Sequence, residues 1–170
     1  MIVQHCEQLD FTKLNPNHLY LWIWHADKIP PHIGCSVNGK YFSLKAKGTD
    51  LNLPIDKTAA LIEKKKIPFL LIEVNKIIAH TIVFETYSNY SKAQANEATC
   101  LTPLLEIFEN PKDVKQLSTF LRFLSDEDLL KSIFGLHLKS DYKGLPEYSM
   151  DAINERLQKL NDAKRKNSIS

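Results

Sequence analysis

The chain has 170 residues, of which 44% are hydrophobic and 25% are charged, a composition typical of one globular domain with a sizeable core. Its net charge of +2 at pH 7 argues against a nucleic-acid partner, because nucleic-acid-binding faces are usually strongly basic. No window approaches the roughly 18 apolar residues that a membrane span requires, so we expect no membrane span.

Cysteine usage indicates a reducing compartment. Cys6, Cys35 and Cys100 are an odd number and show no CxxC spacing, which argues against both a disulfide framework and a four-ligand zinc site. Residues 1–10 do not resemble a secretory signal, since they lack a basic region followed by an apolar core. We therefore expect a cytoplasmic protein with no metal and no cofactor.

The first half of the chain favours strands. Residues 19–24 form an apolar, β-rich run, and residues 33–37 and 41–45 flank Asn38-Gly39, the strongest short signal for a hairpin. A short helix is expected to start at Pro54 or Asp56 and to end near Lys66, before Pro68.

A second hairpin is predicted after this helix. Residues 69–74 and 77–87 are the two expected strands, joined by a turn at Asn75-Lys76. The first of these strands shows little polar alternation, so it should be buried on both faces.

The second half of the chain favours helices, because the apolar period changes from two to about 3.6 after Tyr87. We expect a polar loop over residues 88–98 and then a helix opened by Cys100. Asn110-Pro111 predicts the start of the next helix. The apolar stripe of that helix would comprise Val114, Leu117, Leu121 and Leu124.

Two further helices are predicted. Residues 125–128 are typical of a helix start, and Gly135 of the position just after a helix end. Leu129, Leu130, Ile133 and Phe134 would then face the core. After a loop over residues 139–148, a last helix begins near Ser149 and carries Met150, Ile153, Leu157 and Leu160 on one face.

These elements predict a single α+β domain over residues 1–163, followed by a flexible polar tail over residues 164–170. In this fold an antiparallel sheet from the N-terminal half is covered by helices from the C-terminal half. No repeat or low-complexity linker divides the chain.

Cys100 and His32 are the first candidates for catalysis. A thiol at the start of a helix lies at the positive end of the helix dipole, which favours the thiolate. His32, in Pro30-Pro31-His32-Ile33-Gly34, would remove the thiol proton as general base. The imidazole would be oriented by Ser43 on the next strand, which we favour over Tyr41 because a tyrosine there could equally pack in the core. Backbone N–H groups near Cys100 would stabilise an oxyanion.

The order of these features resembles the circularly permuted NlpC-like papain-fold hydrolases and the related lecithin:retinol acyltransferase-like proteins. The resemblance covers roughly residues 19–108, with His32-Ile33-Gly34, a tight turn, Ser43 on the next strand and Cys100 before a helix. It implies a cysteine hydrolase or acyltransferase acting on an amide or ester. Its substrate would be a small molecule, a peptide-like cell-wall fragment or a lipid.

The alternative is a non-catalytic binding or scaffold domain, which includes a degenerate member of the same fold. Cys100 would then be a small buried hydrophobe, and Trp22 and Trp24, on one side of a strand, would pack in the core or line a ligand groove. His80 also remains a candidate partner of Cys100 in place of His32. The sequence leaves the oligomeric state open.

Overall fold

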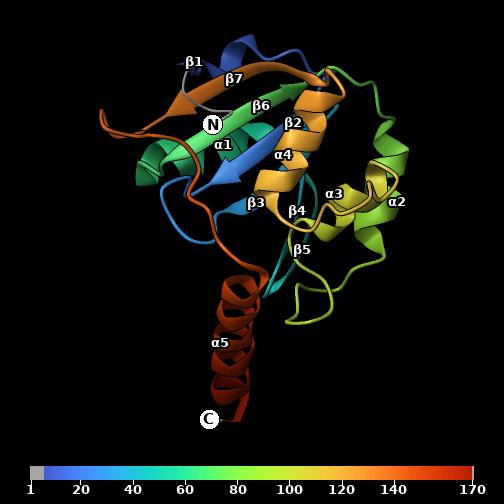
Figure 1. Cartoon of the computed structure of the whole chain (residues 1–170), viewed down its shortest axis with the longest axis vertical. Coiled ribbons are helices and arrows are strands. Elements are labelled where there is room, and N and C mark those ends of the chain that lie inside the picture. The colour runs from blue at the N-terminus through green and yellow to red at the C-terminus, as the bar shows by residue number, and fades with distance from the viewer. Residues whose placement is uncertain (1–5, 170) are drawn as a thin grey trace.

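The computed structural model describes residues 6–169, which form a seven-stranded sheet with helices on both faces (Figure 1). The strands are Glu7–Gln8 (β1), Leu19–Trp24 (β2), His32–Val37 (β3), Lys40–Lys45 (β4), Gly48–Pro54 (β5), Phe69–Val74 (β6) and Leu130–Leu136 (β7). The helices are Ile55–Lys65 (α1), His80–Ser88 (α2), Thr102–Ile107 (α3), Leu117–Asp126 (α4) and Met150–Ile169 (α5), with a 3-10 turn at Phe11–Lys13 (η1). Residues 1–5 and 170, which we assigned to the domain and to its tail, lie outside the described residues.

The strand order is β1-β7-β6-β2-β3-β4-β5. β1 pairs with β7 in parallel, and the other described neighbours are antiparallel. This confirms the predicted α+β class with a mainly antiparallel sheet. None of the helices within residues 6–169 is both long enough and apolar enough to cross a membrane.

The β3–β4 hairpin turns where the sequence predicts. Asn38 and Gly39 have φ values of 52° and 69°, which is the left-handed pair of a two-residue type I′ turn. Asparagine and glycine adopt this conformation at low cost, so the turn fixes the register that places His32 and Ser43 on one face of the sheet.

The core has two parts, one on each face of the sheet. Leu21 and Ile23 of β2 belong to the part covered by α2, α3, α4 and the start of α5. Trp22 and Trp24 belong to the part covered by α1, which confirms that both tryptophans face one side of the strand. Trp22 is fully buried and its Nε1 donates to Ser36 Oγ at 2.8 Å.

The predicted second hairpin is wrong in its second strand. Phe69–Val74 (β6) is a strand buried on both faces, as expected, but His80–Ser88 (α2) is a helix. Both edges of β6 are taken by β2 and β7, so the following segment has no free edge to pair with. As a helix it buries Val83 and Tyr87, four residues apart, on the same face.

The helix predicted after residues 125–128 is also wrong. Leu130–Leu136 (β7) is a strand that pairs with β6 over its whole length. The apolar spacing in this segment fits a helix, but pairing with the buried strand β6 decides the outcome. α4 starts at Leu117 instead of Pro111, because Asn110 and Asp113 adopt positive φ values of 50° and 61°.

The other predicted elements near the site are present, but α3 and α5 differ from the prediction in their ends. α1 runs over Ile55–Lys65 as expected, and residues 139–148 form a loop. α3 begins at Thr102, so Cys100 lies in the turn before the helix and does not open it. α5 runs to Ile169 and therefore includes residues 164–169, which we expected beyond its end.

Candidate functional site

A cavity of about 1060 Å³ lies at the end of the sheet where β3 and β4 separate. The two strands pair from Val37 and Lys40 only as far as Gly34 and Ser43. Beyond this point β4 continues to pair with β5, and the carbonyl of Lys45 accepts a hydrogen bond from the Ala93 N–H at 2.8 Å. We infer that this opening allows one cavity to contact side chains from both faces of the sheet.

His32 is the first residue of β3 and lines this cavity. Burial, reinforced by the nearby Lys45 ammonium, lowers the pKa of His32 to about 4, and Asp50 opposes the shift. The ring is therefore neutral at pH 7. Its Nε2 is buried and has no hydrogen-bond partner among the described residues, although buried polar atoms are usually paired.

Cys100 lies in the turn before α3, on the side of the sheet opposite α1, and also lines the cavity. Its thiol approaches the backbone N–H groups of Ile33, Cys100 and Leu101, which lower its pKa, but burial outweighs them and the pKa is raised. Leu101 N–H also donates to Thr99 Oγ1 at 3.2 Å. At neutral pH the side chain is therefore a thiol.

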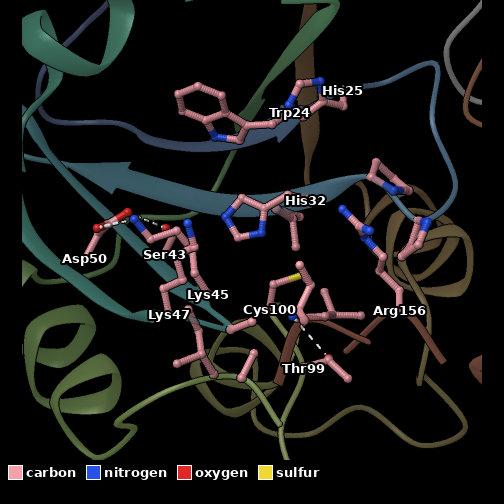
Figure 2. A pocket seen from close by; sticks show the side chains of 18 of the residues that line it. Trp24, His25, His32, Ser43, Lys45, Lys47, Asp50, Thr99, Cys100 and Arg156 are labelled. Carbon is pink, nitrogen blue, oxygen red and sulfur yellow. Dashed lines mark hydrogen bonds and ion pairs between the residues drawn. The ribbon is translucent and has the colours of Figure 1, made fainter. Parts of the chain in front are cut away.

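His32 and Cys100 both line this one cavity, and Figure 2 shows both side chains in its central part. Successive residues of a strand point to opposite faces, so His32 faces the α1 side while Ile33 faces the Cys100 side. No hydrogen bond joins the thiol and the imidazole in the described part of the chain. Because β3 and β4 separate here, a single ligand in the cavity can contact both His32 and Cys100.

Ser43 also lines the cavity, on the same face as His32, because it pairs with Gly34 across the hairpin. Its hydroxyl donates to Asp50 Oδ2 at 2.8 Å, and Lys45 Nζ lies 2.7 Å from Asp50 Oδ1. Of the charged groups that act on the pKa of His32, the carboxylate of Asp50 is the one that raises it, against the effect of Lys45. Ser43 holds this carboxylate in place.

Only glycine fits at position 34, because the backbone of Phe42 and the side chain of Tyr41 come very close to it. A Cβ atom at Gly34 would lie 2.6 Å from the carbonyl oxygen of Phe42 and 2.6 Å from Tyr41 Oη. Tyr41 Oη in turn accepts a hydrogen bond from Trp24 Nε1 at 2.8 Å. The glycine therefore lets Tyr41 and Trp24 form a packed wall beside His32.

Among the polar residues that line the cavity, Lys45, Asp50, Tyr148 and Arg156 were given no role by sequence reasoning. Tyr148 lies close enough to Cys100 for that side chain to contribute to its raised pKa, after burial as the main cause. The Lys47-Gly48 turn, with Asp50 after it, was a usable signal for the Ser43–Asp50 pair. For Tyr148 and Arg156 we find no signal, because they come from a distant loop and helix.

The other candidates lie elsewhere. His80 does not line the cavity, and its Nε2 is 2.7 Å from Asn52 Oδ1. Cys35 is fully buried, and its pKa is raised to about 12 by burial. The described residues include no cluster of three or more His, Cys, Asp or Glu side chains suited to a metal ion.

Comparison of the chain with protein-family models, with curated proteins and with solved structures finds no match.

Proposed function

We propose that the protein is a cysteine-dependent acyl hydrolase or acyltransferase, with Cys100 as nucleophile and His32 as general base. The observation that carries the proposal is that these two side chains, far apart in sequence, line one cavity at the β3–β4 opening. The resemblance to permuted NlpC-like and lecithin:retinol acyltransferase-like proteins supports the same assignment. A cytoplasmic location, where thiols stay reduced, would suit a cysteine nucleophile.

The proposed reaction begins with a neutral imidazole and a protonated thiol, which are the states that the pKa directions favour at pH 7. Cys100 Sγ attacks the acyl carbon of an ester or amide while His32 Nε2 takes the thiol proton. His32 returns this proton to the leaving oxygen or nitrogen, and a thioester remains on Cys100. Water, or an acceptor hydroxyl or amine, then attacks the thioester while His32 Nε2 takes its proton and gives a proton to the departing Cys100 Sγ, which restores the thiol.

In the substrate complex the Cys100 thiol must come within hydrogen-bond reach of His32 Nε2, although the two side chains are not hydrogen-bonded in the described part of the free protein. Catalytic hydrogen bonds are often long before substrate binds. The N–H of Cys100 faces the thiol region and is a candidate donor to the developing oxyanion. Asp50, held by Ser43 and Lys45, is proposed as the positioning residue for His32.

A second candidate function is ligand binding without chemistry. It is favoured by the raised pKa of Cys100 and by the lack of a thiol–imidazole hydrogen bond within the described residues. In that case the same cavity would bind a ligand, and His32 Nε2 would pair with it.

Acylation of Cys100 by a small activated ester distinguishes the two functions. The rate of thioester formation is measured at neutral pH by mass spectrometry of the Cys100 peptide. We expect His32→Gln to slow this reaction by roughly 100-fold or more, the usual contribution of a general base.

His80→Gln is the matched control, because His80 lies outside the cavity, and we expect it to leave the rate unchanged. Equal acylation rates in the two variants would exclude His32 as the base and leave the ligand-binding function.

A further inference from the structure

The walls of the cavity suit an apolar ligand group. Leu44, Leu101, Leu117 and Leu157 line its interior and are buried. At its mouth lie Ile29, Leu53 and Leu61, which are 55%, 39% and 41% exposed. These three are half of the strongly exposed large hydrophobic residues in the described chain, so the apolar surface is concentrated here. Such a lining is typical of a small-molecule site.

Charges around the same cavity are strongly unbalanced. The described lining side chains include one carboxylate, Asp50, which is paired with Lys45. Four other lining cations, Lys28, Lys47, Lys57 and Arg156, form no ion pair with a described residue. The whole chain is nearly balanced, with 22 Lys and Arg against 20 Asp and Glu, so the excess of cations at the cavity is local.

Arg156 is the cation best placed to bind an anion directly. It lies on α5 between Ile153 and Leu157, which are buried in the core and hold this part of the helix in place. Figure 2 shows Arg156 on the side of the cavity opposite Lys45 and Lys47, with His32 and Cys100 between them. A guanidinium suits this role because its planar set of donors matches a carboxylate or phosphate.

We propose that the cavity binds an anionic amphiphile, with an apolar group against the leucine walls and a carboxylate or phosphate bound by Arg156 at the rim. The claim that this ligand is the substrate rests on the proposed function. As an account of binding, it stands on the apolar walls and the excess of unpaired cations.

Such a ligand would also change the chemistry of His32. Lys45 contributes to the low pKa of this imidazole, and an anion in the cavity acts in the opposite direction. Binding would therefore raise the pKa of His32 towards neutrality, where a general base is most effective. The anion would thus both anchor the substrate and improve the base.

The test is a titration of the full chain with decanoate, decyl phosphate and the neutral analogue decanol. Binding is followed by tryptophan fluorescence, because Trp24 lines the cavity, and is repeated by calorimetry. We expect at least one anion to bind roughly tenfold or more tightly than decanol, with an advantage that decreases at high salt. Preference for decanoate would identify a carboxylate ligand, and preference for decyl phosphate a phosphate ligand.

Two variants locate the anion site. Arg156→Gln should weaken anion binding roughly tenfold and leave decanol binding unchanged. Arg165→Gln is the matched control, because Arg165 is an exposed arginine on the same helix that does not line the cavity, and we expect no effect. Equal affinities for anion and alcohol, or no effect of Arg156→Gln, would overturn the inference.

The binding measurements use Cys100→Ser as well as the native chain, so that they do not depend on chemistry. Selective anion binding without His32-dependent acylation of Cys100 would reject the proposed enzyme and keep the anion site. Acylation that depends on His32 but shows no preference for anionic ligands would reject the anion site and keep the enzyme.

Discussion

The low pKa of His32 makes the stability of the folded protein depend on pH. Its imidazole is buried beside Lys45, and its Nε2 has no partner among the described residues. The folded state therefore favours the neutral ring, whereas the unfolded chain protonates it near the ordinary pKa of 6.5. A base whose pKa is lowered by folding destabilises the protein in acid, because only the unfolded state gains the proton.

We predict that this residue contributes to acid unfolding over a defined pH range. As the pH falls from 6.5 to about 4, His32 becomes protonated in the unfolded chain only. This should lower the free energy of unfolding by about 3 kcal/mol. Urea denaturation of the native chain and of His32→Gln measures this term. Other titrating groups are common to both proteins, so the free energy of the variant should fall less steeply. Parallel curves would mean that His32 is not desolvated.

Sequence reasoning found those site residues whose side chains suggest a catalytic role by themselves. Cys100 and His32 were predicted because a thiol at a helix start favours the thiolate and an imidazole can serve as its base. Asp50 and Arg156 are ordinary charged residues, and only the distant contacts of β5 and α5 give them a role. The divergence of β3 from β4, which creates the cavity, depends on pairing beyond the hairpin turn.

Elements were predicted well where a local signal and the tertiary environment agree. The Asn38-Gly39 turn and the buried run of β2 satisfy both. The segment that forms β7 was predicted to be a helix because its apolar spacing fits a helical face. In the structure it is a strand that pairs with β6. The same pairing removes the free edge that residues 77–87 would need as a strand. Local periodicity could not decide whether these two segments are helices or strands, because the outcome depends on which segment pairs with β6.

α5 is an element whose two halves should contribute very differently to stability. Ile153 and Leu157 in its first turns pack into the core, whereas residues 162–168 are exposed and the helix projects away from the sheet (Figure 1). We predict that Leu157→Ala lowers the free energy of unfolding by about 2 kcal/mol or more, through lost burial and a cavity.

The matched change is deletion of residues 164–170, which should alter the unfolding free energy by less than about 0.5 kcal/mol. Urea denaturation of both variants provides the comparison. A large loss on deletion, with little effect of Leu157→Ala, would mean that the distal half of α5 packs against something else.

The whole molecule is organised around β2, the middle strand in the order β1-β7-β6-β2-β3-β4-β5. β2 and β6 are buried along their entire length, whereas the residues of the terminal strand β5 are all at least partly exposed. Local opening needs less free energy where fewer contacts are lost. Opening at the β5 edge should therefore be frequent, and release of β2 should require unfolding of the whole sheet.

Hydrogen exchange of the native chain tests this gradient. We predict that the amides of Leu21 and Ile23 exchange only through global unfolding, with an opening free energy equal to that from urea denaturation. Amides of β5 that point away from β4 should exchange orders of magnitude faster, because the sheet order gives β5 no neighbour on that side. If β5 exchanged as slowly as β2, its edge would be covered in solution by another chain, and dilution would then restore fast exchange. Slow β5 exchange that is independent of concentration would contradict the gradient.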